Sequence, residues 1–252
     1  TLSYSPSFGY ELCVRRYRGE PLDLSSWRAA GIGGDMVRSE ALNQFSETFA
    51  ACGFKSTAFV ASYGLAESTL AVCFAPLDGG LTTDRVDALR MQTSNRALPA
   101  SDLTREGSDR TFVACGKPLS STELKICGVD GEILDQRQVG KILIRGPSIA
   151  IGYFRAEHEL QSLTDSDGWL DTGDLGYWLG EEIVVTGRSK DMILWHGRNI
   201  WPQDIEWIAQ KVGGRAVGKA AAFEVQDFKD ATRIVLLVES RSQEPEIRAA
   251  MT

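Results

Sequence analysis

Residues 62–69, with the sequence SYGLAEST, place an aromatic ring, a glycine and a carboxylate within one turn. They follow an apolar segment that predicts a buried strand, and open α/β sheets bind ligands where strands end. Tyr63 can stack on a base, Gly64 lets backbone come close, and Glu67 can hold a hard cation such as Mg²⁺. A partly buried tyrosine beside a capping carboxylate gives the same pattern, so the triplet alone leaves both readings open.

A second stretch, GWLDTGDLG at residues 168–176, contains an Asp-Thr-Gly turn. Aspartic proteases need two such turns whose carboxylates share a proton, and this chain has one copy, followed by Asp174. A calcium loop counted from Asp165 would need an oxygen ligand and a glycine where Trp169 and Leu170 stand. These two readings are excluded. Asp174 remains a clamp for a hydroxylated ligand or a residue that caps a turn.

Charge and composition narrow the class of partner. The 252 residues carry a net charge of -7 and are 43% hydrophobic. No stripe of Lys and Arg is available to neutralise phosphates, which argues against a nucleic-acid or anionic-membrane surface. No apolar run approaches the roughly 18 residues of a membrane span, and no charged-then-apolar leader precedes Thr1. We expect a soluble, cytoplasmic protein, without an integral membrane segment, that binds a small molecule or another protein.

The five cysteines are odd in number and widely spaced, with no CxxC pair, which favours a reduced setting. The chain has two histidines, His158 and His196, so a zinc site would need ligands from remote places. We therefore expect the cysteines and histidines to be unliganded.

The elements that must position these side chains are predicted from apolar spacing. Leu42, Phe45 and Phe49 share one face of a helix. Ser39 is a plausible N-cap for it and Gly53 a stop signal. The apolar segment KSTAFVASYG follows as a strand, so the first 75 residues predict an α/β layer.

From 78 to 111 the pattern weakens into a polar segment rich in Gly, Ser and Asp, which is typical of a long surface insertion. Its one short helix signal lies at Val86 and Leu89. Short strands then return as TELKIC, GKILIRG and EEIVVTG, and they predict a small β-rich unit.

After Arg188 the pattern changes again. The sequence MILWHGRNIWPQDIEWIAQKVGG predicts a short strand, a turn and a helix that begins near Pro202. KAAAFEVQD and TRIVLLVES predict two further strands, and SQEPEIRAAMT the first turns of another helix. We place a domain boundary between Ser189 and Lys190. Trp195 and Trp201, which flank HGRNI, are interpreted as core packing or as a carrier-protein surface.

Five stretches, taken in order, resemble the core motifs of the adenylate-forming superfamily, which includes acyl-CoA synthetases, peptide-synthetase adenylation domains and luciferases. They are SYGLAEST, GKILIRGPSIAIGYF, GWLDTGDLG, GRSKDMI and GRNIWPQDIE. YELCVRRY, YGLAESTLAV and the polar segment before VACGKPL further resemble fatty acyl-AMP ligases, which carry an insertion in about this place.

The resemblance implies an α/β (α+β) fold in two parts. Residues 1–189 would be the C-terminal portion of a large nucleotide- and acyl-binding domain, with 78–111 as its insertion and a small β-rich subdomain. Residues 190–252 would begin a small, mobile α+β domain.

The resemblance also implies roles for the residues of SYGLAEST. Tyr63 would stack on adenine, with Gly64 beside it, and Glu67 would bind Mg²⁺ as part of the catalytic machinery. Gly33 and Gly34, in IGGDMV, match a turn beside the adenine.

Four later positions complete the implied site. Asp35 departs from the small residue or Glu that is common beside that glycine turn. Asp174 would accept hydrogen bonds from both ribose hydroxyls. Arg188 would reach the ribose and phosphate region. Lys190 would be the hinge about which the small domain rotates between half-reactions.

The implied reaction uses ATP and Mg²⁺ to convert a fatty acid into acyl-AMP, with release of pyrophosphate. The acyl group then passes to the phosphopantetheine of an acyl carrier protein or polyketide synthase. Two alternatives stay open: an acyl-CoA synthetase, and a non-catalytic interaction module. The family's phosphate loop and adenylation lysine have no counterpart in the chain, so we expect an internal fragment that is inactive alone in ATP–pyrophosphate exchange.

Overall fold

The computed structural model describes residues 1–101, 104, 108–154, 160–214, 217–226 and 232–240. The chain separates into two compact units, Thr1–Thr186 and Gly187–Thr252. This division lies close to the predicted boundary, while the assignment of the units to a large and a small catalytic domain stays a prediction. No helix in the described ranges is long and apolar enough to cross a membrane.

A five-stranded sheet opens the first unit, with the strand order β1-β2-β3-β4-β7. Strands β1 (Leu2–Ser5), β2 (Ala29–Ile32) and β3 (Phe59–Tyr63) pair in parallel. Strand β4 (Cys73–Phe74) pairs antiparallel with β3, and β7 (Lys117–Pro118) pairs antiparallel with β4. All of β2 and most of β3 are buried, as expected for parallel strands covered on both faces. The predicted strand 55–64 is shorter than expected, because Ser56–Ala58 forms a 3-10 turn, η2.

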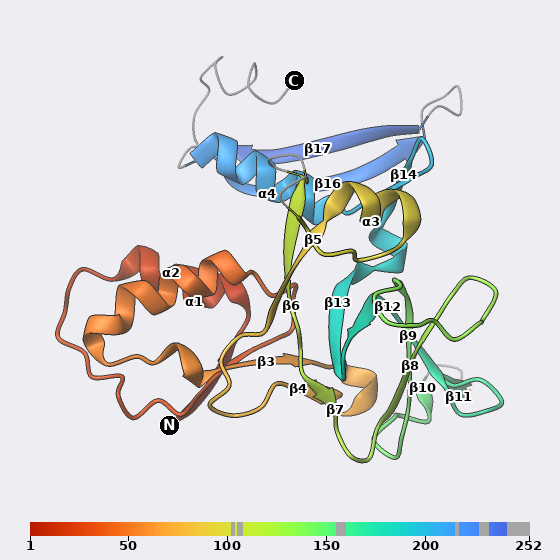
Figure 1. Ribbon diagram of the computed structural model, residues 1–252, viewed down its shortest axis with the longest axis horizontal. Coiled ribbons are helices and arrows are strands. Elements are labelled where there is room, and N and C mark those ends of the chain that lie inside the picture. Colours follow the sequence, from red (N-terminus) through yellow and green to blue (C-terminus); the bar gives the residue numbers. More distant parts are fainter. Residues whose placement is uncertain (102–103, 105–107, 155–159, 215–216, 227–231, 241–252) are drawn as a thin grey trace. The chain divides into compact units, whose positions relative to one another are not determined.

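Helices α1 (Ser7–Arg16) and α2 (Ser39–Phe49) lie side by side over this sheet (Figure 1). The predicted apolar face of α2 is confirmed, because Leu42, Phe45 and Phe49 are buried in the core. Gly53 ends the following 3-10 turn, η1 (Ala50–Cys52), at a φ of 82°.

The predicted N-cap of α2 is wrong. Ser39 is the first helical residue, the cap position belongs to Arg38, and no side chain caps the helix. The Arg38 backbone amide instead donates to Ser7 Oγ at 3.1 Å. A hydroxyl from α1 therefore binds an amide at the start of α2, which no local cap signal encodes.

The described part of the polar segment contains regular structure. It forms β5 (Thr83–Asp87), α3 (Ala88–Ser94) and the start of β6 (Asp109–Val113), and the two strands pair antiparallel. The predicted helix signal was misplaced: Val86 is a buried strand residue, and α3 buries Met91 while Leu89 is 42% exposed. Alternation, with Asp84 and Val86 facing inward, outweighs the short helical spacing.

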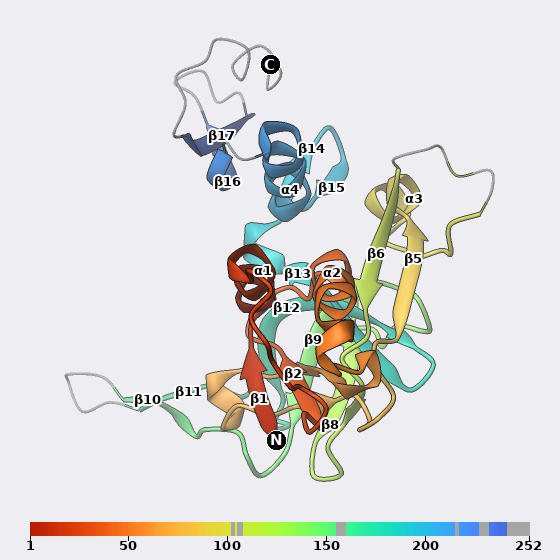
Figure 2. The same ribbon diagram turned by 90° about the vertical axis from the view of Figure 1, so that its left-hand side faces the viewer.

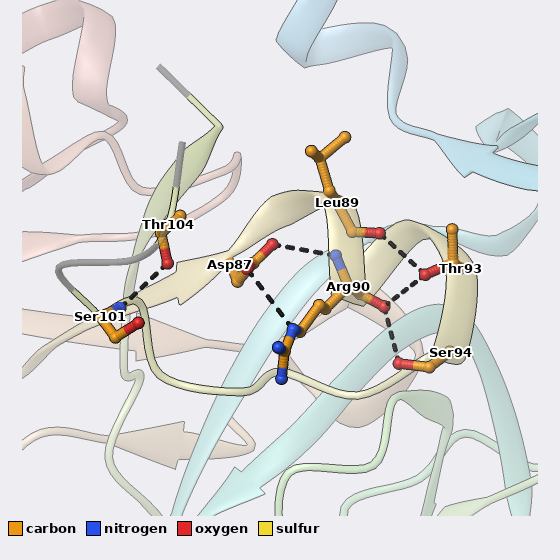
Figure 3. A network of polar contacts seen from close by, with 7 residues as sticks. All are labelled: Asp87, Leu89, Arg90, Thr93, Ser94, Ser101 and Thr104. Atoms are coloured by element: carbon orange, nitrogen blue, oxygen red, sulfur yellow. Dashed lines mark hydrogen bonds and ion pairs between the residues drawn. The ribbon is translucent and has the colours of Figure 1, made fainter. Parts of the chain in front are cut away.

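Asp87 begins α3 as a side-chain N-cap (Figure 3). Its Oδ1 accepts the Arg90 amide at 3.0 Å, and its Oδ2 lies 3.8 Å from Arg90 Nε. Thr93 and Ser94 donate their hydroxyls back to carbonyls one turn earlier, at 3.0 and 2.7 Å. A seven-residue helix is thus stabilised at its first turn by a charged cap.

A four-stranded antiparallel sheet forms the β-rich part of the first unit, in the order β13-β12-β9-β8. The predicted strands correspond to β8 (Glu123–Cys127), β9 (Gly140–Arg145) and β13 (Glu182–Arg188). Strand β12 (Leu170–Leu179), which includes most of GWLDTGDLG, was not predicted because its polar residues break the alternation. A hairpin of β10 (Gly152–Phe154) and β11 (Leu160–Ser162) stands out from the rest of this unit (Figure 2).

The second unit matches the predicted strand, turn, helix and strand pair. It contains the 3-10 turn η4 (Ser189–Asp191), β14 (Ile193–Trp195), β15 (Arg198–Ile200), α4 (Pro202–Gly213), β16 (Val217–Gln226) and β17 (Thr232–Ser240). Pro202 is the first residue of α4, as predicted. Trp201 is buried at 2% exposure, which agrees with core packing. The predicted helix at 242–252 lies outside the described residues.

Candidate functional site

The predicted glycine turn and the predicted aromatic residue lie at neighbouring strand ends. Gly33 directly follows β2 and Tyr63 ends β3, and these two strands pair in parallel. A Cβ on Gly33 would lie 2.7 Å from Ser62 Oγ and 3.1 Å from the Ser62 carbonyl oxygen, so this position accepts no side chain without displacement. Gly34, at a φ of +85°, has the left-handed backbone that glycine adopts without strain.

Tyr63 and Asp174, 111 positions apart in sequence, meet in the structure. The Tyr63 hydroxyl donates to Asp174 Oδ2 at 2.7 Å. The exposed fractions are 9% for Tyr63 and 7% for Asp174. A hydrogen bond to an ionised acceptor is among the stronger ones, so the phenol holds the buried carboxylate in place.

Burial is the main cause that raises the pKa of Tyr63 well above its ordinary value, and the neighbouring Asp174 carboxylate adds to it. Tyr63 is therefore a hydrogen-bond donor at physiological pH. This role was not predicted, since the sequence pointed only to the face of its ring.

A bulge in β12 presents Asp174. Asp171 pairs with Leu143 and Leu175 pairs with Lys141, so four positions on β12 correspond to two on β9. Gly173 turns the chain at a φ of +73°. Thr172 Oγ1 donates to the Ile142 carbonyl at 2.8 Å and accepts the Asp174 amide at 3.2 Å. Extra residues in a strand commonly re-aim a side chain, and here the re-aimed side chain is Asp174.

The turn after β3 holds Glu67. The 3-10 turn η3 (Ala66–Ser68) folds the chain back so tightly that a Cβ on Gly64 would lie 1.5 Å from the Leu70 carbonyl oxygen. Gly64 is thus required by the backbone beside the site. The Glu67 carboxylate accepts a hydrogen bond from the Tyr153 hydroxyl, which the motif GKILIRGPSIAIGYF contained without any role assigned to it.

The remaining predicted residues lie at other places. Asp35 Oδ1 accepts the Ser7 amide at 3.4 Å, so this departure from the motif contacts the start of α1. Arg188 ends β13 and Lys190 lies in η4, and both belong to the second unit. The structure brings Gly33, Tyr63 and Asp174 together in the first unit, while the roles of Arg188 and Lys190 stay predictions.

Residues 2–154 match the family described as AMP-binding enzyme. The chain belongs to this family. The matched residues end before β12, so Asp174 lies outside them. Tyr63 lies within the matched residues, and its hydroxyl is hydrogen-bonded to Asp174.

Relatives of this AMP-binding enzyme chain align with nearly all of it. It is 45% identical to a "putative acyl-CoA synthetase" of Caulobacter vibrioides (strain NA1000 / CB15N), over 100% of this chain and 44% of that protein. It is 35% identical to a medium-chain-fatty-acid–[acyl-carrier-protein] ligase of Moorena producens (strain JHB), over 95% of this chain and 42% of that protein.

A solved structure from a study of fatty acyl-adenylate ligases of E. coli and L. pneumophila superposes with a TM-score of 0.87 and 38% identity. It covers 99% of this chain and 45% of the solved one. The mixed α/β fold predicted from the sequence is confirmed by this likeness. The chain spans less than half the length of the relatives it matches.

Proposed function

We propose that the full-length protein containing this chain activates a fatty acid with ATP and then loads it onto an acyl carrier protein. In the first step a carboxylate oxygen attacks the α-phosphorus and pyrophosphate leaves. In the second step the phosphopantetheine thiolate attacks the acyl carbonyl and AMP leaves. The observation that carries the proposal is the Tyr63–Asp174 hydrogen bond, which joins SYGLAEST to GWLDTGDLG, the two stretches that we interpret as nucleotide motifs.

The chain's own residues would bind and orient the nucleotide. Asp174 would accept the ribose hydroxyls, because a carboxylate has several lone pairs and the Tyr63 phenol takes one of them. The Tyr63 ring would lie against adenine, and Gly33 would let that base approach the backbone. Arg188 would interact with the phosphate, and Lys190 would serve as the hinge. These contacts would accelerate the reaction by positioning, which needs no nucleophilic side chain.

Glu67 has the chemistry that Mg²⁺ requires. Mg²⁺ prefers oxygen ligands and is usually held by one or two carboxylates together with substrate phosphates. In the described part of the chain no three His, Cys, Asp or Glu side chains gather as a metal cluster. We place Mg²⁺ on Glu67, with the phosphates of ATP completing the site. When bound, it would offset the charge of the phosphates during attack by an anion.

Coenzyme A is the alternative to the carrier protein as the source of the acceptor thiol. The Caulobacter relative, at 45% identity, is named for coenzyme A, whereas the Moorena ligase is named for a carrier protein. An assay that offers both acceptors to the full-length protein distinguishes the two alternatives. We expect the thioester to form on the holo carrier protein. Faster transfer to coenzyme A would make coenzyme A the acceptor and would leave the proposed adenylation step unchanged.

Substitution of Asp174 tests the nucleotide site. In the full-length protein, Asp174→Ala should weaken ATP binding at least about tenfold, since a hydrogen bond to a charged group contributes about 1.5–3 kcal/mol. Equilibrium binding of a non-hydrolysable ATP analogue measures this. Glu123→Ala is the control in the same sheet, because Glu123 is largely exposed and pairs with Arg145 at 2.6 Å, away from the bulge. Equal affinity in the wild type and Asp174→Ala would refute the ribose role.

A further inference from the structure

The turn that bears Glu67 is fastened to residues 148–153. The Ala150 amide donates to the Glu67 carbonyl at 2.8 Å. Thr69 Oγ1 donates to the Ser148 carbonyl at 2.8 Å, and the hydroxyls of Ser68 and Ser148 lie 3.1 Å apart. The backbone of Glu67 and the side chains of the two residues that follow it are thus bonded to the segment that leads into β10.

Tyr153, in β10, completes this arrangement at the carboxylate itself. Its hydroxyl donates to Glu67 Oε1, although Tyr153 is 51% exposed. An exposed hydrogen bond replaces one made to water and adds little to folding, but it restricts the rotamers of the carboxylate that accepts it.

A glutamate on a surface turn samples several rotamers, and a metal ligand works best when its orientation is fixed. Metal-binding carboxylates are themselves hydrogen-bonded by neighbouring groups, and removal of such a partner typically weakens metal binding about 10–100-fold. Tyr153 stands in this relation to Glu67. Its oxygen is bonded to one carboxylate oxygen, while the turn below is held by Ser148 and Ala150.

We propose that Tyr153 is a positioning residue that orients the Glu67 carboxylate toward the cation bound with the nucleotide. The inference rests on the proposed function, because it takes Glu67 as the Mg²⁺ ligand. It adds that the β10–β11 hairpin is coupled to the cation site: whatever moves Tyr153 changes how well Mg²⁺ is held.

The test measures metal binding without turnover. The dissociation constant of α,β-methylene-ATP is determined for the full-length protein in Mg²⁺ and again in EDTA. The ratio of the value in EDTA to the value in Mg²⁺ reports how much Mg²⁺ strengthens nucleotide binding. Tyr153→Phe keeps the ring and removes the phenol. We expect it to reduce the ratio about tenfold and to leave the dissociation constant in EDTA unchanged.

Two further variants make the outcome decisive. Tyr17→Phe is the matched control, because it also removes a phenol bonded in the first unit, to the Glu20 carbonyl, and should leave the ratio unchanged. Glu67→Gln should reduce the ratio at least as much, and Tyr153→Phe should add nothing in that background. A reduced ratio in Glu67→Gln with a wild-type ratio in Tyr153→Phe overturns the positioning role alone. A wild-type ratio in Glu67→Gln overturns the assignment of Mg²⁺ to Glu67 and this inference with it.

Discussion

Asp174 is a buried carboxyl group, and its neighbours explain how it keeps one orientation. The phenol of Tyr63 donates to its carboxylate, and Thr172 accepts its amide within the β12 bulge. The sequence predicted Asp174 and Tyr63 as separate parts of a nucleotide site. Their direct bond could not be predicted, because no local spacing relates residues 111 positions apart.

Tyr63→Phe separates the two roles of Tyr63. The variant keeps the ring for stacking but removes the donor to a buried carboxylate, so the free energy of unfolding should fall by about 1–3 kcal/mol. Nucleotide affinity should also fall, because the Asp174 carboxylate loses its fixed orientation. Urea unfolding and equilibrium nucleotide binding measure the two effects.

Tyr63→Leu is the comparison for that experiment. It removes both the phenol and the aromatic face, so it should bind nucleotide more weakly than Tyr63→Phe. If the two variants bind equally well, the ring contributes nothing to nucleotide binding and the stacking role is wrong.

The elements differ in how far the sequence determines them. The apolar faces of α2 and the start of α4 at Pro202 follow from local periodicity and turn chemistry, and both were predicted correctly. Strand β12 escaped prediction because its bulge places polar residues at consecutive positions. Strand β5 was misread because Asp84, a buried charge, stands where a strand pattern has an apolar residue.

The partners of Asp84 explain why a carboxylate is tolerated in the core. Arg137 forms a two-pronged ion pair with it at 3.0 and 3.1 Å, and the Tyr177 hydroxyl donates to Oδ2 at 2.7 Å. Arg137 also donates to the Ala97 carbonyl at 2.7 Å. This network joins the polar segment, through β5 and residue 97, to β12, so it anchors the segment against the β-rich sheet.

Asp84→Ala should therefore be strongly destabilising. It leaves Arg137 and the Tyr177 hydroxyl without their carboxylate, and removal of one partner from a buried pair costs about 3–5 kcal/mol. About a quarter of the Arg137 side chain is exposed, so we expect a loss of about 2–4 kcal/mol in the free energy of unfolding. Urea denaturation measures the loss, and hydrogen exchange should show faster opening of β5 and α3.

Asp109→Ala is the matched control in the same hairpin. Asp109 pairs with Arg85 at 2.6 Å, but the Arg85 side chain is 64% exposed. Exposed ion pairs contribute about 0–1 kcal/mol. Equal losses for the two variants would contradict the anchoring role of Asp84.

Over the whole molecule, the predicted site residues are divided between the two units. Gly33, Tyr63, Glu67 and Asp174 belong to the first unit, and Lys190 to the second. These positions could be predicted because each lies in a short continuous motif. The packing around buried groups involves residues far apart in sequence, and it determines how the free energy of unfolding depends on pH.

Five buried acidic groups share one electrostatic property. Burial is the main cause that raises the pKa of Cys73 and of the Tyr10, Tyr63 and Tyr177 phenols, and that raises the pKa of Cys115 to about 12. In each case the folded protein retains a proton that the unfolded chain loses near its ordinary pKa. The unfolded state therefore binds fewer protons above that pH, and stability falls as the pH rises.

This sign predicts a two-step profile for the free energy of unfolding. It should not depend on these groups below about pH 8, where both states are protonated. The thiols of Cys73 and Cys115 should lower it first, above their ordinary pKa of about 8.5, and the three tyrosines should steepen the loss above about pH 10. Each group contributes up to about 1.4 kcal/mol per pH unit. Urea unfolding between pH 8 and pH 11 at constant ionic strength measures the profile.

Tyr177→Phe assigns part of that profile to one phenol. The variant is less stable at every pH because Asp84 loses a donor, so the informative quantity is the slope against pH rather than the absolute value. Above about pH 10 its slope should be shallower by about 1.4 kcal/mol per unit, since one proton-retaining group is gone. Between about pH 8.5 and pH 10, where the thiols dominate, its slope should match that of the wild type. A wild-type slope above pH 10 would show that the Tyr177 phenol ionises in the folded protein as readily as in water, and that its burial does not hold the proton.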